Sequence, residues 1–306
     1  MAAAPRARNG DVMRSTRGPR TLVGAAALGI ALCLATSAAI NPVVASAAMP
    51  VRLPVDAEAG PLADMVVGPR AAKVPSTGGA MLAPQATGSL SGRTIVVDPG
   101  HNGVYRKKVN RRPVAAGNGR KKACNSSGTA TNAGFAEHRF NWRVAIDLVG
   151  QLRARGATVV LTRPSNGGTG PCVNERAAIG NRARADLVVS IHADGSYTAR
   201  ARGFHVIVSK AMAGGSRVEA RSKAIARELR SRIARTGMPR STYIGNGTAL
   251  SVRSDLAGLN LSRVPAVMLE AGNMRNKADA RLLSSTAWRL TLAAALADGV
   301  VAALVG

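Results

Sequence analysis

Short apolar runs rich in β-branched residues alternate along the chain with longer stretches whose apolar residues recur at helical spacing. This alternation leaves few folds open, because parallel strands joined by helices are buried on both faces of their sheet. We expect strands at 94–98, 158–161, 187–191, 203–208 and 266–269. We expect helices at 135–155, 174–184, 218–235 and 286–304. The sequence therefore predicts an α/β fold, a single domain with a mostly parallel twisted sheet flanked by helices.

The start of the chain has the three parts of a secretory signal peptide, which are a basic stretch, an apolar run and a small-residue cleavage pattern. Five arginines come first, the apolar run extends over 21–40, and Ala45-Ser46-Ala47 follows. We therefore expect 1–47 to be a signal peptide that is cleaved after Ala47. The alternative is an uncleaved membrane anchor, because the run is near spanning length, although its Ala and Gly residues make it a weak span.

Composition divides the rest of the chain into two parts. Residues 48–90 are rich in Pro, Ala, Gly and Val and show no sustained period, so we expect a flexible linker there. Order begins near residue 93, and we expect one domain over 91–306. A chain with a signal peptide is exported, so the expected location is the periplasm or the cell wall.

The cysteine count is compatible with export. The chain has three cysteines, and Cys33 lies inside the predicted signal peptide. Cys124 and Cys172 remain after cleavage, and both stand in loop sequence rich in Gly, Asn and Ser. In an oxidising compartment such a pair most simply forms one disulfide, which we predict here. Two separate buried thiols are the alternative.

The formal net charge of +26 implies an anionic neighbourhood, such as nucleic acid, phospholipid or an acidic cell-wall polymer. The poverty in aromatic residues and the predicted export argue against nucleic acid, so no nucleic-acid partner is expected. Eight basic residues and no acidic one fall within 106–122, which we call the basic segment: Arg106, Lys107, Lys108, Arg111, Arg112, Arg120, Lys121 and Lys122. We predict that it attaches the protein to anionic wall polymers, and a solvated loop is the alternative.

Three residues of metal-ligand type stand at the ends of predicted strands. His101 follows the first strand in VVDPGHNG, His192 closes a strand in VVSIHAD, and Glu270 closes another in PAVMLEAGN. Because the carboxyl ends of strands in open α/β sheets converge on one crevice, we expect these side chains to lie together. Glu137, in the first turn of the helix at 135–155, can reach the same edge.

These residue types suit metal-assisted hydrolysis. Two histidines and one carboxylate form a ligand set that leaves Zn²⁺ an open position for water. Zn²⁺ lowers the pKa of that water to about 7, and a second carboxylate can take its proton during attack on an amide. Each residue taken alone has a structural explanation, but a single site accounts for all four.

Four strings in this order resemble the zinc-dependent N-acetylmuramoyl-L-alanine amidases, in particular their secreted mycobacterial and actinobacterial branch. The strings are TIVVDPGHNG, the E-x₃-N of Glu137 and Asn141, DLVVSIHAD and VPAVMLEAGNMRN. The resemblance covers about 93–304. It implies hydrolysis of the amide between N-acetylmuramic acid and L-alanine in peptidoglycan, which releases stem peptides.

By this resemblance, His101, Glu137 and His192 would bind one Zn²⁺ per chain, and Glu270 would be the catalytic carboxylate. The domain at 91–306 would then be a zinc amidase domain. Its substrate would be peptidoglycan or soluble muropeptides, and we expect the protein to be a monomer.

The sequence departs from the family pattern at Asn102, Asp194 and Asn273, none of which is a proposed ligand. A non-catalytic peptidoglycan-binding or regulatory homologue is the alternative function, which metal content and release of stem peptide would distinguish. Two further histidines are interpreted as structural. His138 adjoins Glu137 on the helix and points about 100° away from it, and His205 lies within a predicted strand, where lining the cleft is its alternative role.

Overall fold

The computed structural model of the protein describes residues 79–306, so the predicted signal peptide and the predicted linker up to residue 78 lie outside the described residues. Seven strands form one sheet in the order β1-β5-β2-β6-β9-β7-β8, and two more form a small separate sheet. The strands are β1 (Ala80–Leu82), β2 (Thr94–Pro99), β3 (Pro113–Ala115), β4 (Lys121–Ala123), β5 (Thr158–Leu161), β6 (Leu187–Asp194), β7 (His205–Ser209), β8 (Leu250–Arg253) and β9 (Ala266–Asn273). The helices are α1 (Lys107–Asn110), α2 (Glu137–Ala154), α3 (Val173–Arg182), α4 (Gly215–Ile233), α5 (Ala257–Asn260), α6 (Lys277–Ser284) and α7 (Thr286–Val305).

The large sheet is mostly parallel, as predicted. Strands β5, β2, β6 and β9 run parallel to one another and form its centre. At one edge, β1 pairs with β5 in the antiparallel direction. At the other side, β7 pairs antiparallel with β9, and β8 is parallel to β7. The predicted fold class is therefore confirmed, with reversed strands on both sides of a parallel centre.

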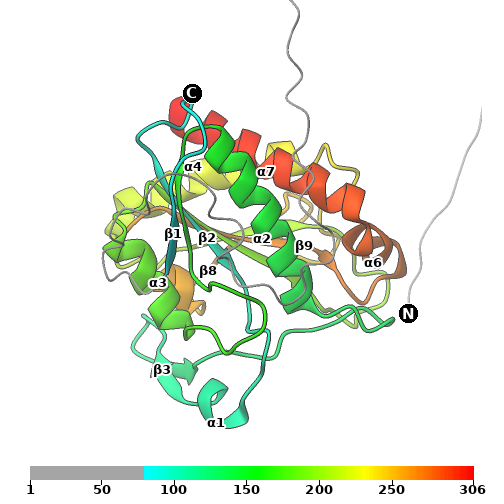
Figure 1. Ribbon diagram of the computed structural model, residues 1–306. Helices are drawn as coiled ribbons and strands as arrows, with labels where there is room; N and C mark the ends of the chain where they lie inside the picture. The colour runs from blue at the N-terminus through cyan, green and yellow to red at the C-terminus, as the bar shows by residue number, and fades with distance from the viewer. Residues whose placement is uncertain (1–78) are drawn as a thin grey trace, which may run out of the picture. The chain divides into compact units, whose positions relative to one another are not determined.

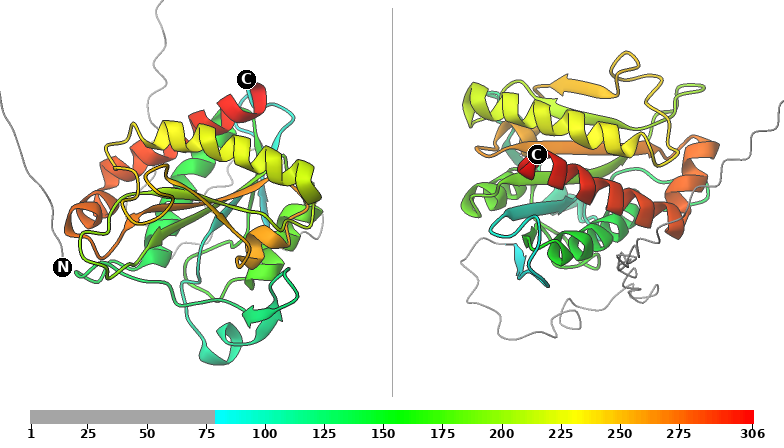
Figure 2. Two further views of the ribbon diagram at one scale, coloured as in Figure 1. Left: turned by 180° about the vertical axis from the view of Figure 1, so that it is seen from behind. Right: turned by 90° about the horizontal axis from the view of Figure 1, so that it is seen from above.

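Helices cover both faces of this sheet. Helices α2, α4 and α7 lie side by side on one face, and α3 and α5 lie on the other (Figures 1 and 2). The buried side of α2 follows helical spacing through Phe140, Val144, Leu148 and Leu152, which is why this helix forms and packs as predicted. Helix α7 contacts both α2 and α4 and buries Leu292, among others. Its length and apolar composition would also suit a membrane span, a property that core helices share.

The domain begins earlier than the sequence predicts. Residues 80–82 form an edge strand on β5, and the side chains of Leu82 and Leu90 are buried in the main core. The amide of Leu90 donates to the carbonyl oxygen of Arg155 at 2.8 Å. The predicted linker at 48–90 is therefore wrong over 79–90, which belong to the folded domain. The reason is that a three-residue edge strand is too short to show a period.

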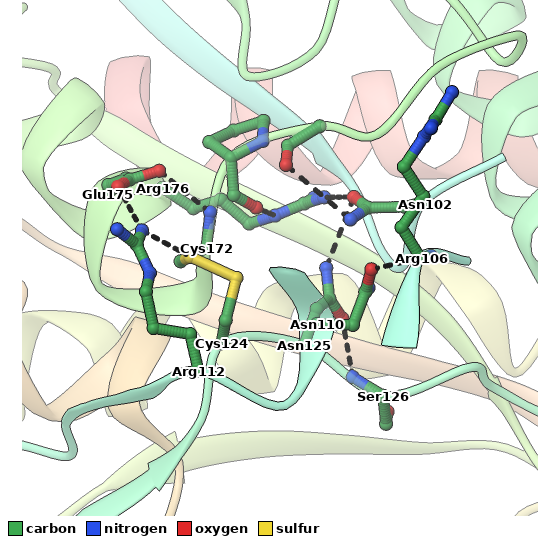
Figure 3. The surroundings of a disulfide bond; sticks show 12 residues. Asn102, Arg106, Asn110, Arg112, Cys124, Asn125, Ser126, Cys172, Glu175 and Arg176 are labelled. Carbon is green, nitrogen blue, oxygen red and sulfur yellow. Dashed lines mark hydrogen bonds and ion pairs between the residues drawn. A yellow bond between two sulfur atoms is a disulfide. The ribbon is translucent and has the colours of Figure 1, made fainter. Parts of the chain in front are cut away.

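The predicted long loop before α2 is partly ordered into α1 and the β3–β4 pair. A disulfide between Cys124 and Cys172 joins the end of this region to the start of α3, and Val114 packs against both cysteines. Figure 3 shows Arg112 directed at this bond, with its guanidinium 3.3 Å from Glu175. The basic segment therefore folds around a small core of its own.

Candidate active site

The three residues predicted as metal ligands come together at the carboxyl-terminal edge of the parallel strands. Nε2 of His101 lies 2.9 Å from Oε1 of Glu137, and Nδ1 of His192 lies 3.0 Å from the same oxygen. The two ring nitrogens are 3.2 Å apart, and the candidate ligand atoms all lie within 4.8 Å of one another. His101 and Glu137 are buried, and His192 is half-buried. Two imidazole nitrogens and a carboxylate oxygen thus face one point.

A tight turn after β2 places His101. Its φ of 60° is a left-handed conformation that residues other than glycine seldom adopt. Gly100 precedes it, and a side chain at that position would collide with the ring of His192. Nδ1 of His101 lies 3.1 Å from the carbonyl oxygen of Ser126, which can only accept a hydrogen bond. The ring proton is therefore assigned to Nδ1, and the lone pair of Nε2 faces Glu137 and His192.

Glu137 is the first residue of α2, and two backbone amides hold its carboxylate. The amide of Thr129 donates to Oε2 at 3.0 Å, and the amide of Ala193 donates to Oε1 at 3.2 Å. Burial alone would raise the pKa of Glu137, but the adjacent charge and hydrogen bonds of His101 and His192 hold this pKa well below its usual range. The carboxyl group is therefore ionised at neutral pH.

The donor set fits a divalent metal ion. Burial lowers the pKa of His192, so its imidazole is neutral at pH 7, as metal binding requires. Burial would lower the pKa of His101, but Glu137 and the Ser126 carbonyl together outweigh it, so the pKa is raised above its usual value. A metal cation would therefore compete with a proton for this ring. Imidazole nitrogens together with a carboxylate are the usual ligands of catalytic zinc sites.

A buried ion pair supports the turn that carries His101. Arg176 of α3 donates to Asp98 and to the carbonyl oxygen of His101, at 2.7 Å in each case. The hydroxyls of Thr162 and Ser190 also donate to Asp98, at 2.5 and 2.7 Å. Burial opposes ionisation of Asp98, but the Arg176 charge and these hydrogen bonds lower its pKa to about 2. The turn is therefore tied to both β6 and α3.

Glu270, predicted as the catalytic carboxylate, lies on β9 opposite His192 of β6 on one side and His205 of β7 on the other. Its Oε2 is buried and has no hydrogen-bond partner within 79–306. Burial and the nearby charges of Glu137 and Asp194 raise the pKa of Glu270 well above its usual value. A raised pKa brings a carboxyl group toward the neutral range in which general acid–base catalysis works.

All four predicted site residues line one cavity of about 490 Å³. The loop at 125–129 and the start of α3 form part of its wall, and α5 forms another part. Lys122 of the basic segment also lines the cavity, and its Nζ lies 3.2 Å from the carbonyl oxygen of Asp255. The convergence expected from strand ends is therefore found in the structure.

Two side chains beside Glu270 were not predicted as part of the site. His205 reaches this position because β7 runs antiparallel to β9, which brings its first residue level with Glu270. The ring of Tyr243 packs edge-on against His205, and its hydroxyl donates to Asp194 at 2.8 Å. Burial lowers the pKa of His205 to about 4, so its ring is neutral at pH 7. His138 contributes no atom to the ligand cluster.

Comparison with known proteins gives one consistent family. The family model described as N-acetylmuramoyl-L-alanine amidase matches residues 95–302. N-acetylmuramoyl-L-alanine amidase Rv3717 of Mycobacterium tuberculosis is 41% identical over 216 residues, which cover 69% of this chain and 86% of that protein.

Solved structures agree with the sequence comparison. The N-acetylmuramyl-L-alanine amidase Ami1 from Mycobacterium smegmatis superposes with a TM-score of 0.67 and 39% identity, covering 70% of this chain and 98% of that chain. The apo form of Ami1 from Mycobacterium abscessus gives a TM-score of 0.66 and 40% identity, covering 70% and 99%. The family match at 95–302 spans the strands and the helix that carry the four converging side chains, and the relative and both structures belong to the same family by name. The chain therefore belongs to the N-acetylmuramoyl-L-alanine amidase family.

Proposed function

We propose that this protein hydrolyses the amide bond between N-acetylmuramic acid and L-alanine in peptidoglycan, and so releases stem peptides. The observation that carries the proposal is the convergence of His101, Glu137, His192 and Glu270 on one cavity, in a chain of this family. Peptidoglycan or soluble muropeptides would be the substrate.

In this proposal His101, Glu137 and His192 hold one Zn²⁺ per chain. A bound zinc ion would polarise the amide carbonyl and lower the pKa of a water molecule in its open position to about 7. The carbonyl oxygen of Ser126 keeps His101 in the tautomer that a ligand needs, and the amides of Thr129 and Ala193 keep the Glu137 carboxylate in place.

Glu270 is proposed as the group that moves protons. It accepts a proton from the attacking water as the water oxygen bonds to the amide carbon. It then donates that proton to the leaving nitrogen as the carbon–nitrogen bond breaks, which yields the lactyl carboxylate and the free amine of L-alanine. The burial that raises the pKa of Glu270 helps it to keep the proton between these two steps.

The experiment that tests the proposal combines metal analysis with product identification. The purified protein is expected to contain one zinc ion per chain and to convert a muramoyl dipeptide into the free sugar acid and the free dipeptide, as mass spectrometry would show. A chelator should abolish turnover, and added zinc should restore it. A protein that binds peptidoglycan but releases no peptide, with or without zinc, would instead be the non-catalytic homologue.

We further propose that residues 1–47 are a signal peptide and that the Pro-, Ala- and Gly-rich residues 48–78 tether the domain. Peptidoglycan lies outside the cytoplasmic membrane, so its hydrolysis supports action in the periplasm or cell wall. A disulfide between Cys124 and Cys172 is compatible with such an oxidising location.

The basic segment is proposed as the attachment to anionic wall polymers. Its cationic residues are exposed except for Lys122, which is half-buried at the cavity. Arg112 already pairs with Glu175, so the remaining six exposed cations are the ones available to a polyanion.

A further inference from the structure

A second, polar cavity of about 250 Å³ lies beside the catalytic one. Consecutive parts of the same two loops line both cavities. Thr129 and Gly195 line the catalytic cavity, and Asn132 and Ser196 line the second one. Gly195 packs so closely on Thr129 that a side chain there would collide with it. The contact between these two residues therefore separates neighbouring cavities.

An exposed aromatic ring stands at this second cavity. Tyr197 is 80% exposed, more than any other large hydrophobic residue within 79–306. The guanidinium carbon of Arg275 lies 4.9 Å from the centre of its ring, and Nη1 of Arg275 donates to Asn132 at 3.3 Å. Nε of Arg275 is buried without a hydrogen-bond partner in the described part of the chain. Arg275 therefore supports the ring from one face, while most of the tyrosine remains in solvent.

Buried side chains fix the loop that carries Tyr197. The side-chain amide of Asn273 donates to the carbonyl oxygens of Ser196 and Ala201, at 2.9 and 2.8 Å. The carboxylate of Asp279, which is fully buried, accepts hydrogen bonds from the backbone amides of Gly203 and Asn273. A tyrosine ring that stays in water gains no stability from burial, so the folding of this loop does not explain why the ring is there. A ring that is already held in place loses little freedom when a ligand binds, which favours binding.

We propose that this second cavity is a saccharide subsite, in which a sugar ring of the peptidoglycan glycan strand stacks on Tyr197. The proposal rests on the proposed function, because the bond to be cut joins a glycan to a peptide and the substrate must leave the catalytic cavity in two directions. The carbon–hydrogen face of a pyranose packs on an aromatic face, whose quadrupole is negative. The side-chain amides of Asn132 and Asn276 and the Arg275 guanidinium supply hydrogen bonds for hydroxyl and acetamido groups.

Another part of the catalytic cavity's lining differs in chemistry from the second cavity. Lys122 lines the catalytic cavity but not the second one, and its Nζ lies next to the carbonyl oxygen of Asp255. An ammonium group suits the carboxylates of a stem peptide, whereas an exposed aromatic ring flanked by amides suits uncharged sugars. The glycan therefore extends toward Tyr197 and the peptide toward Lys122. Because Arg200 and Lys277 also line the second cavity, binding of peptide carboxylates there is the competing outcome.

The first test measures binding without catalysis. A peptide-free tetrasaccharide of alternating N-acetylglucosamine and N-acetylmuramic acid is titrated into the protein and followed by NMR. Tyr197→Ala should weaken its binding about five- to ten-fold, the loss of one ring stack. Tyr105→Ala is the matched control, because Tyr105 is 43% exposed and lines neither cavity, and it should leave binding unchanged. Equal binding by the wild type and Tyr197→Ala would overturn the proposal.

The second test separates glycan from peptide through kinetics. In Tyr197→Ala, the KM for a disaccharide-linked peptide should rise about five-fold, while the KM for a muramoyl peptide lacking the second sugar stays within about two-fold. Equal KM changes for both substrates, or changes that follow the number of peptide carboxylates, would overturn the saccharide assignment. If the wild type bound the tetrasaccharide but hydrolysed neither substrate, the proposed function would fail and the sugar site would stand.

Discussion

The carboxylate of Asp98 is buried beneath the catalytic turn and depends on Arg176 for its charge. Its pKa is about 2 in the folded protein, against 3.8 for the free side chain. A pKa lowered by folding contributes stability that is fully present above the unfolded pKa and is lost as the pH falls through the folded pKa. From this difference, the contribution at neutral pH is about 2 kcal/mol.

We therefore expect Asp98→Asn to lower the free energy of unfolding by at least about 2 kcal/mol at neutral pH, because it also leaves Arg176 buried without its partner. Urea denaturation at several pH values is the measurement, and the gap between wild type and variant should narrow as the pH falls from about 4 to about 2. Asp298→Asn, which removes a half-exposed ion pair with Arg155, should cost less than about 1 kcal/mol. A gap for Asp98→Asn that does not change with pH would contradict this account.

Individual site residues differ in how well the sequence predicts them. His101, His192 and Glu270 were predicted because each has a ligand-type side chain at the end of an apolar strand, where parallel strands meet. His205 was interpreted as structural, although the structure places it level with Glu270. The direction of β7 depends on long-range pairing, and a single sequence carries no local signal for it.

At the scale of elements, the first ordered strand lies in the region predicted as a linker. A protein that starts at Ser91 loses β1 and the buried side chains of Leu82 and Leu90, and it leaves the edge of β5 unpaired. We expect its free energy of unfolding to be about 3–6 kcal/mol lower than that of a protein that starts at Gly79.

Chemical denaturation measures the free energy of unfolding of both proteins, which differ only by residues 79–90. Leu90→Ala in the longer protein is the point-substitution counterpart and should cost about 2–4 kcal/mol. If both truncated proteins were equally stable, residues 79–90 would not belong to the folded domain.

The disulfide is the second element-scale feature that can be tested. Cys124 and Cys172 are separated by 48 positions, and in the chain-entropy model closing a loop of that length stabilises a protein by about 4 kcal/mol. Replacing both cysteines by serine should lower the free energy of unfolding by about that amount. Thiol titration of the unreduced, denatured protein without residues 1–47 should find no free thiol. Two titratable thiols would show that the bond does not form in the exported protein.

Elements with a clear apolar pattern were predictable, and short elements without one were not. The strand at 158–161 has the predicted bounds, and α2 differs from the predicted helix by one or two residues at each end. By contrast, α1, β3, β4 and β8 have three or four residues each and lack the continuous β-branched apolar run that identifies the equally short strand at 158–161. Strands β6 and β9 also extend beyond their apolar runs, to Asp194 and Asn273, because their pairing with each other continues past the apolar residues.

At the scale of the whole molecule, charge is the dominant property. The net charge of +26 is spread over the chain, but the basic segment concentrates eight cations, of which Lys122 lines the catalytic cavity. Replacing Lys107, Lys108 and Arg111 by glutamine should weaken binding to insoluble cell-wall sacculi and flatten its salt dependence. Turnover of a small soluble muropeptide should change less than about two-fold, because none of the three lines the cavity.

Helix α4 offers a control with the same change in net charge. It lies on the sheet face that α2 and α7 also cover, away from the basic segment (Figure 1). Its exposed cations include Arg217, Lys223 and Arg227. Their replacement by glutamine should affect sacculus binding less than the change in the basic segment. Equal effects of the two triple variants would mean that overall charge, and not the basic segment, governs attachment.

The proposed mechanism divides two roles between glutamates of one cavity: Glu137, which is buried, binds the metal, and Glu270, which is half-buried, moves protons. Measuring zinc content and turnover on the same preparation of Glu270→Gln tests it most directly, with Glu137→Ala as the matched variant. Glu270→Gln keeps the size of the side chain but removes its basicity, so zinc should stay bound while kcat falls by about 10² to 10⁴. Glu137→Ala should lose zinc and activity together. Loss of zinc from Glu270→Gln with retention in Glu137→Ala would exchange the two roles, and full turnover by Glu270→Gln would contradict the account.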